Sequence, residues 1–266
     1  MPGIDNGVWH YRETGTGRPL VLLHGIGMSH FVWNPVTPFL CTTRRVIAFD
    51  TAGFGLTPPL PEGTVPTVSH LVDGLEKSIY QMGIELPVDI AGNSLGGYMA
   101  LEAARRGLAR TAVAICPAGL WKEHPAPHVR YVFGALRFLA RKPSGLSNAV
   151  MRIPVLREAA FAVPISVGSR RMAANDALRL VDDLARSPAF EDTFDATRAP
   201  FSGVEIAVPV TVAFGDRDYI ITKCSRWRDG LPAHTRWFTI RGWGHVPMWA
   251  DSPGVARLIL NGSENA

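Results

Sequence analysis

Cysteine is scarce in this sequence, and the few cysteines present form no recognisable set. Cys41, Cys116 and Cys224 are odd in number, widely spaced and without a CxxC pair. Disulfide frameworks and structural zinc sites both need paired, closely spaced cysteines. We therefore predict no disulfide framework and no metal site, and we expect a reduced, cytoplasmic compartment.

Long apolar runs and long basic runs are also missing. The sequence has no stretch of 18 apolar residues and no basic N-terminal segment followed by an apolar one. We therefore expect neither an integral membrane segment nor a signal peptide. The formal net charge is only +4, and no run of Lys or Arg exceeds two residues. A solvated basic face explains this mild excess, and we predict no nucleic-acid partner.

What the sequence does contain is an alternation of strand-like and helix-like segments. Short apolar or alternating runs predict strands over residues 7–13, 19–23, 45–50, 87–91, 111–116, 208–214 and 235–240. Helical spacing predicts helices over residues 31–40, 65–82, 94–106, 222–231 and 253–260. This alternation indicates an α/β fold with a mostly parallel, doubly wound sheet and helices on both faces.

Residues 120–200 break the alternation, because they combine helical spacing with several prolines and contain no comparable strand run. We predict a core domain of residues 1–119 and 201–266, with residues 120–200 inserted as a helical cap. The apolar side chains of the cap either line a pocket or form the core of the cap, and its arginines meet either an acidic substrate or solvent. The residues concerned are Phe133, Leu136, Phe138, Leu139, Met151, Phe161 and Met172, and Arg130, Arg137, Arg170 and Arg171.

The strongest motif is a serine in the pattern G-x-S-x-G. The segment Gly92-Asn93-Ser94-Leu95-Gly96 directly follows a predicted strand and opens a predicted helix. A nucleophile on such a sharp turn has a strained backbone, and side chains two residues before and after it would collide with neighbouring backbone. We predict that Ser94 is a catalytic nucleophile.

A nucleophilic serine needs a base, and the base needs a carboxylate that orients it. Among the eight histidines, His245 lies in a glycine-rich loop after the last predicted strand, at the edge where the loops of a doubly wound sheet converge. Asp218 comes three residues after the glycine that ends the preceding strand. We predict His245 as the base and Asp218 as its carboxylate, with Asp216 pairing with Arg217 or capping a turn.

Two backbone N–H groups are expected to bind the oxyanion that forms when the serine attacks a carbonyl group. One is the N–H of Leu95, which begins a helix, and the other is the N–H of Ile26, in the glycine-rich loop after the first buried strand. We predict a structural hydrogen-bonding role for His24, which ends that strand. Further candidates for substrate contact are Gly25, Asn93, Val246 and Trp249.

The ordered motifs resemble the α/β-hydrolase superfamily over essentially the whole chain. The matching segments are HGIG (24–27), Trp33 with Pro38, DTAGFGLT (50–57), GNSLGG (92–97), GDRD (215–218) and GHVPMWADSP (244–253). The resemblance implies a mostly parallel sheet of eight strands, with the helical cap inserted after strand six. It also implies a Ser–His–Asp catalytic triad and an acyl-enzyme mechanism that requires no metal or organic cofactor.

Several functions fit this resemblance. The favoured one is a carboxylesterase-like serine hydrolase that cleaves an ester, or a similar acyl bond, of a small hydrophobic substrate. The alternative is a C–C bond hydrolase of the meta-cleavage-product type, although those enzymes usually carry Trp directly after the catalytic histidine, where this chain has Val246. A ligand-binding protein without turnover is disfavoured by the complete triad, and Ser94 in place of Asp sets aside haloalkane dehalogenases and epoxide hydrolases. The expected partner is a small-molecule acyl substrate, and a homo-oligomer is left open.

Overall fold

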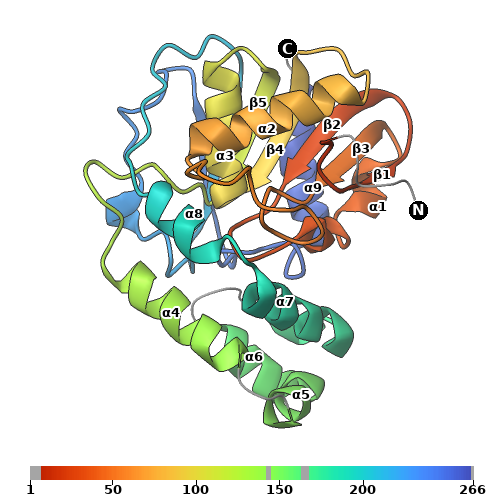
Figure 1. Cartoon of the computed structure of the whole chain (residues 1–266), viewed down its shortest axis with the longest axis vertical. Helices are drawn as coiled ribbons and strands as arrows, with labels where there is room; N and C mark the ends of the chain where they lie inside the picture. The colour runs from red at the N-terminus through yellow and green to blue at the C-terminus, as the bar shows by residue number, and fades with distance from the viewer. Residues whose placement is uncertain (1–6, 142–144, 163–167, 265–266) are drawn as a thin grey trace.

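The computed structural model describes residues 7–141, 145–162 and 168–264, and one seven-stranded sheet forms the centre of this part of the chain (Figure 1). The strand order is β1-β3-β2-β4-β5-β6-β7; β1 runs antiparallel to β3, and all other neighbours are parallel. The strands are β1 (Tyr11–Thr14), β2 (Arg18–Leu23), β3 (Arg44–Phe49), β4 (Val88–Asn93), β5 (Ala109–Ile115), β6 (Val210–Gly215) and β7 (Arg236–Ile240).

The middle strands are buried on both faces, which explains their unbroken apolar sequences. The four residues from Leu20 to Leu23 are fully buried, and β4 and β6 are buried along their whole length. The outer strands β1 and β7 are largely exposed or half-buried. Because β2 to β7 are parallel, their carboxyl ends meet at one edge of the sheet, and the loops that leave them converge there.

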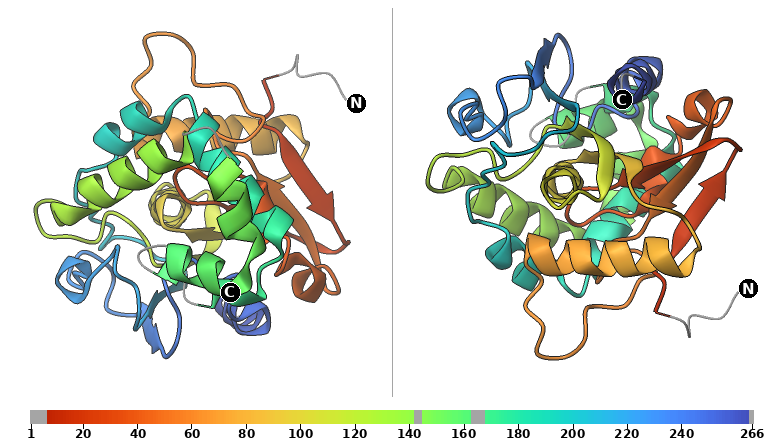
Figure 2. Two further views of the ribbon diagram at one scale, coloured as in Figure 1. Left: turned by 90° about the horizontal axis from the view of Figure 1, so that it is seen from below. Right: turned by 90° about the horizontal axis from the view of Figure 1, so that it is seen from above.

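Helices cover both faces of the sheet. Figure 2 shows α2 (Val68–Gln81) and α3 (Leu95–Arg105) on one face, and α1 (Thr37–Leu40) with α9 (Ser252–Ser263) on the other. In α2 the apolar residues at helical spacing are the buried ones, and the side chain of Thr67 accepts a hydrogen bond from the N–H of His70 at the start of the helix. The predicted α/β class, with helices on both faces of a mostly parallel sheet, is confirmed.

The described part of the segment between β5 and β6 contains helices joined by loops, and no strand. It contains α4 (His128–Ala140), α5 (Gly145–Arg152), α6 (Pro154–Ala162), α7 (Ala174–Arg186) and α8 (Phe190–Ala196), and a 3-10 turn at Ser169–Arg171. Helix α7 packs against α4 and α5, and α5 against α6. Figure 1 shows α4 to α7 as a layer beyond one edge of the sheet. The division of the chain into a core and a cap at residues 120 and 200 stays a prediction.

Two expectations from the sequence need correction. Each of the seven predicted strand runs became one strand, but the eighth strand implied by the family resemblance is absent from the described residues, so the helical segment follows the fifth strand found there. The helix predicted over residues 222–231 is only a 3-10 turn, Lys223–Ser225. The backbone of Arg226 leaves helical geometry (φ −120°, ψ 62°), and its side chain instead donates to the carbonyl groups of Ile221 and Gly215.

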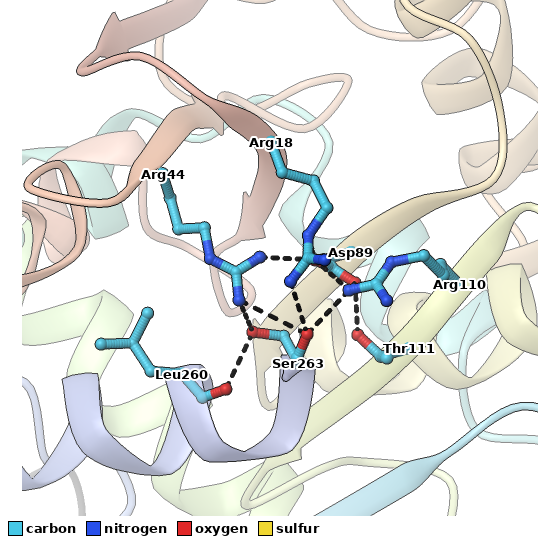
Figure 3. A network of polar contacts seen from close by, with 7 residues as sticks. All are labelled: Arg18, Arg44, Asp89, Arg110, Thr111, Leu260 and Ser263. Atoms are coloured by element: carbon cyan, nitrogen blue, oxygen red, sulfur yellow. Dashed lines mark hydrogen bonds and ion pairs between the residues drawn. The ribbon is translucent and has the colours of Figure 1, made fainter. Parts of the chain in front are cut away.

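A buried ion cluster closes the opposite, amino-terminal edge of the parallel strands (Figure 3). The fully buried carboxylate of Asp89 in β4 contacts Arg18, Arg44 and Arg110, which belong to β2, β3 and β5. The same three guanidinium groups donate to the carbonyl oxygen of Ser263 at the end of α9. Cations are favourable at a helix carboxyl terminus, so the cluster fixes α9 to four strands at once.

Candidate active site

Ser94 lies on a strained turn between β4 and α3. Its backbone has φ 55° and ψ −114°, a region that non-glycine residues rarely adopt. A methyl group on Gly92 would lie 2.0 Å from the carbonyl oxygen of Gly96, and one on Gly96 would lie 2.1 Å from the carbonyl oxygen of Leu23. The predicted reason for both glycines is thereby confirmed, because any side chain there would force the turn open.

Ser94, His245 and Asp218 form a hydrogen-bonded chain at the carboxyl edge of the sheet. The distance from His245 Nε2 to Ser94 Oγ is 3.0 Å, and the distance from His245 Nδ1 to Asp218 Oδ2 is also 3.0 Å. All three residues are buried. The serine follows β4, the aspartate follows β6 and the histidine follows β7, so residues 151 positions apart meet because these parallel strands all end at the same edge of the sheet. This geometry suits proton transfer from the serine hydroxyl to the imidazole.

The carboxylate of Asp218 is held as an anion by donors on several sides. Its Oδ1 accepts the N–H groups of Ile220 and Ile221, each at 2.9 Å, and its Oδ2 faces His245. Burial by itself raises the pKa of Asp218, but the charge and hydrogen bond of His245 and the further donors outweigh it and lower the pKa below its ordinary value. An ionised Asp218 can therefore orient the imidazole and stabilise its cation.

The two aspartates of the segment 215–218 have separate environments. The Oδ1 atom of Asp216 accepts the N–H of Gly242 at 2.7 Å, on the exposed side of the loop. A methyl group on Gly215 would lie 2.0 Å from the carbonyl oxygen of Trp243, so this glycine lets the loop with His245 approach the loop with Asp218. Asp216 thus links the two loops on the exposed side, whereas Asp218 is buried between them, next to His245.

Cys116 and Asn93 support this geometry in roles that the sequence did not predict. Cys116 follows β5 with φ 45°, and its fully buried thiol donates to the carbonyl oxygen of Gly244 at 3.7 Å and lies within 4.8 Å of the Asp218 carboxylate. Burial and then the charge of Asp218 raise the pKa of Cys116 well above its ordinary value, so it remains a neutral S–H donor. The amide of Asn93 donates to the carbonyl oxygen of His245 at 2.9 Å and thereby fixes the loop of the imidazole.

Ile26 and Leu95, the predicted oxyanion donors, border the smaller of two cavities together with Ser94. Among the described residues, no backbone acceptor contacts the N–H of Ile26, and the N–H of Leu95 opens α3, where helices have no intrahelical acceptor. His24 donates from Nδ1 to the carbonyl of Gly25 at 2.7 Å, and its Nε2 accepts the N–H of Thr51 at 2.9 Å. Both ring nitrogens are therefore occupied, and burial lowers the pKa of His24, as suits a neutral structural residue.

Two cavities meet at Ser94, beneath the helical segment. The larger has a volume of about 150 Å³ and is bordered by the loop 25–28, by His245 and by side chains of α4, α5, α6 and α7. The smaller has a volume of about 50 Å³ and extends past Leu95 toward Trp121, Arg198 and Ser225. Ile26, Phe133 and Ile220 border both cavities. A reacting carbonyl at Ser94 would therefore have room for one group on each side.

The structure sorts the predicted pocket residues into two groups. Gly25 borders the larger cavity, together with five of the apolar residues of the helical segment, namely Phe133, Leu136, Leu139, Met151 and Phe161. Asn93, Val246 and Trp249 are buried but border neither cavity; the indole of Trp249 donates to Asp176 and packs near Phe31. Phe138 is exposed, and Met172 is buried away from both cavities.

Three of the four arginines that the sequence offered as substrate contacts bind protein groups. Arg130 pairs with Asp195, Arg137 donates to the carbonyl groups of Leu184 and Ser187, and Arg171 donates to that of Ala250. The side chain of Arg170 lies outside the described residues. These three arginines therefore do not reach the serine, whereas Arg198 borders the smaller cavity together with Ser94.

Two clusters in the described residues bring potential metal ligands within 4.8 Å of one another. One is Cys116, Asp218 and His245 of the site itself. The other is His10, His30 and Asp50, where the fully buried Asp50 accepts both Nδ1 atoms at 2.9 and 2.8 Å as well as two backbone N–H groups. The oxygen atoms of both carboxylates already accept hydrogen bonds from protein donors. Hydrogen bonding therefore explains why the residues of each cluster lie close together.

Three features together define a hydrolase of the α/β type. They are the mostly parallel sheet with helices on both faces, the serine on a strained strand-to-helix turn, and the apolar cavity under the inserted helices. The chain belongs to the α/β-hydrolase family, whose model matches residues 20–258. Of the helices in the described residues, none combines the length and hydrophobicity needed to cross a lipid bilayer.

Relatives of this chain have diverse activities. It is 32% identical over 205 residues to the epoxide hydrolase EphH of Mycobacterium tuberculosis, covering 72% of this chain and 92% of that protein. It is 27% identical to the pimeloyl-[acyl-carrier protein] methyl ester esterase of Methylococcus capsulatus, covering 92% and 94%. Among solved structures, the meta-cleavage product hydrolase of Pseudomonas fluorescens superposes with a TM-score of 0.72 at 22% identity, covering 95% and 92%, a likeness in fold.

Proposed function

We propose that this protein is a serine hydrolase that cleaves a carboxylic ester of a small hydrophobic substrate through an acyl-enzyme. The observation that supports this most directly is the continuous hydrogen-bonded chain from Ser94 through His245 to Asp218, with both donor–acceptor distances at 3.0 Å. A binding protein needs no such chain, because binding requires no activated nucleophile.

In the proposed reaction, Ser94 Oγ bonds to the ester carbonyl carbon while His245 Nε2 takes the hydroxyl proton. The carbonyl oxygen becomes an oxyanion that accepts the N–H groups of Ile26 and Leu95, and Asp218 stabilises the imidazolium. The C–O bond to the alcohol then breaks, and His245 returns the proton to the leaving oxygen. Water, deprotonated by His245, releases the acid from Ser94 by the same steps. The cycle is complete without a cofactor.

Epoxide opening, the activity in the name of one relative, suits this nucleophile poorly. An epoxide carbon attacked by a serine hydroxyl would become an alkyl ether of Ser94. Water cannot release that ether through a tetrahedral oxyanion, because the ether has no carbonyl carbon. A carboxylate nucleophile forms an ester instead, which water can hydrolyse. Ester cleavage uses the oxyanion donors and the triad together, and for that reason we favour it.

A fluorophosphonate probe and an aryl ester test the proposal. We expect the probe to modify Ser94 in the folded protein, with the modified peptide identified by mass spectrometry, and p-nitrophenyl butyrate to be hydrolysed. The Ser94→Ala variant should neither react nor hydrolyse. Absence of labelling and of ester turnover in folded wild-type protein would refute the hydrolase proposal. Turnover of a vinylogous 1,5-diketone acid with poor ester turnover would instead favour C–C bond hydrolysis.

The cellular compartment and the partner belong to the same proposal. Cys41 and Cys116 carry free thiols, which suits the reducing cytoplasm that the cysteine pattern predicts. The partner is a small-molecule acyl substrate, because the cavities beside Ser94 have the dimensions of small organic groups.

A further inference from the structure

We propose that the larger cavity beside Ser94 takes an uncharged, apolar arm of the substrate, about six carbon atoms long or the size of a phenyl ring, and rejects an arm that ends in a carboxylate. The inference rests on the proposed function and specifies its substrate. It separates this chain from relatives whose names describe dicarboxylate, dienoic acid or acyl-carrier substrates.

The lining of the larger cavity is apolar almost throughout. Ser94 and His245 supply the only polar side chains among the described residues that border it, and both are already used in the hydrogen-bonded chain. The side chains opposite them come from four helices and include Leu136, Leu180 and Leu184. An apolar group gains free energy by leaving water for this lining, in proportion to its buried area.

Cations near the cavity face away from it. Arg157 is buried in α6, but its guanidinium group donates to the carbonyl oxygens of Met151 and Ser169. Arg137 is buried in α4 and donates to carbonyl oxygens of the α7 end. Among the described residues, no Lys or Arg borders the larger cavity. A carboxylate placed there would lose its water without gaining an ion pair, which is strongly unfavourable.

The volume of the larger cavity sets the length of the arm. Its volume is about 150 Å³. Apolar protein cavities of about this size hold one benzene molecule. The second cavity, at about 50 Å³, is a third as large. It is also more polar, since Thr197, Arg198 and Ser225 border it. The carbonyl at Ser94 is therefore expected to carry one long apolar arm and one short arm.

Two matched pairs of esters test the charge of the long arm. Methyl hexanoate and monomethyl adipate differ only in a terminal carboxylate on the acyl arm. Hexyl acetate and 6-acetoxyhexanoate differ in the same way on the alcohol arm. Hydrolysis is followed by pH-stat titration with the purified wild-type protein. For whichever neutral ester reacts faster, we expect its carboxylate partner to have kcat/KM lower by about 100-fold or more, because an unpaired charge would be buried.

Variants of the cavity wall test its location and size. Leu180→Lys places an amine in the wall, and we expect it to reduce the difference between the neutral and charged esters by about tenfold or more. Ala160→Leu fills part of the cavity, so its best p-nitrophenyl ester should have a shorter acyl or alkyl chain than that of the wild type. Ala196→Leu, on α8 and bordering neither cavity, is the matched control and should leave chain-length preference unchanged.

The outcomes separate this inference from the proposed function. Equal or faster hydrolysis of the charged esters by a protein whose Ser94 reacts with fluorophosphonate would overturn the inference and leave the hydrolase intact. An unchanged chain-length profile in Ala160→Leu, with circular dichroism like that of the wild type, would also overturn it. Absence of all ester hydrolysis together with an unreactive Ser94 would refute the proposed function itself. Ala160→Leu keeps the test decisive if Leu180→Lys fails to fold.

Discussion

The two edges of the parallel sheet each bury a carboxylate, and they surround it in opposite ways. At the amino edge, Asp89 contacts three guanidinium groups that stay charged at all physiological pH values. At the carboxyl edge, Asp218 faces one imidazole and neutral N–H and S–H donors. The first arrangement fixes positions, and the second leaves one partner free to gain and lose a proton. The chemistry of the partner, more than burial, separates a structural carboxylate from one suited to catalysis.

The largest expected effect of a single substitution on activity is at the carboxyl edge. Asp218→Asn keeps the shape of the side chain but removes the charge that stabilises the imidazolium. We expect kcat to fall by about 10⁴-fold. We also expect the free energy of unfolding to fall by no more than about 2 kcal/mol, because the amide oxygen can still accept the N–H groups of Ile220 and Ile221. Ester kinetics measure kcat, and urea denaturation measures the free energy of unfolding. A large loss of stability with only a modest change in kcat would contradict the proposed difference between the two edges.

The matching substitution at the amino edge should reverse the pattern. Asp89→Asn leaves Arg44 buried without its carboxylate, so we expect a loss of about 3 kcal/mol in the free energy of unfolding, at the lower end for broken buried pairs because Arg18 and Arg110 reach solvent. The fraction that remains folded should retain kcat/KM within about twofold. A selective loss of activity at full stability would contradict this structural role.

Acid should weaken the carboxyl edge through Asp218. Its folded pKa lies below the ordinary value of 3.8. The ionised form therefore stabilises the fold fully above that value, and the stabilisation is lost as the pH falls toward the folded pKa. As the pH falls from about 5 to about 3, we expect the wild type to lose more unfolding free energy than Asp218→Asn, which has no carboxylate to protonate at this position. A pH-independent difference in urea titrations would contradict the lowered pKa.

A smaller effect is expected at Cys116, whose weak S–H donor binds the carbonyl oxygen of Gly244 next to His245 and lies beside the Asp218 carboxylate. Cys116→Ala removes the S–H group and should lower kcat/KM by roughly fivefold, the equivalent of one modest hydrogen bond. Cys116→Ser restores a donor and should recover most of that loss. Because Ala and Ser fit the strained backbone at this position equally well, an identical loss in both variants would indicate packing in place of hydrogen bonding.

The sequence alone predicted what depends on local pattern and missed what depends on distant contacts. Seven strand runs and the Gly92–Gly96 turn could be located because burial on both faces and a strained turn each restrict residue type locally. The helix expected over residues 222–231 is absent, since the N–H of Trp227 donates to the carbonyl oxygen of Leu120, far away in the sequence, and Arg226 binds the carbonyl groups of Ile221 and Gly215.

The contacts around Asp89 also depended on the tertiary structure, although the sequence held one clue. A carboxylate inside an otherwise apolar strand needs a partner, but its arginines lie on three other strands. The role of Cys116 carried no such clue, because cysteine is among the residues most often buried, and the acceptor of the Asn93 amide lies 152 residues further along the chain. The cavity lining could not be separated from the core of the helical segment, since apolar side chains serve both equally well.

The chain leaves β5 at the carboxyl edge of the sheet, and on its way back to β6 the N–H of Phe201 donates to the carbonyl oxygen of Gly119 at 2.8 Å. The two ends of the helical segment therefore lie side by side at these residues, before the chain continues to the start of β6. Longer connections add little closure entropy. A different helical segment could be grafted between these strands without changing any strand register or moving Ser94 from its turn. Exchange of the helical segment would then change which substrates are accepted, while the residues around Ser94 would keep the same reaction chemistry.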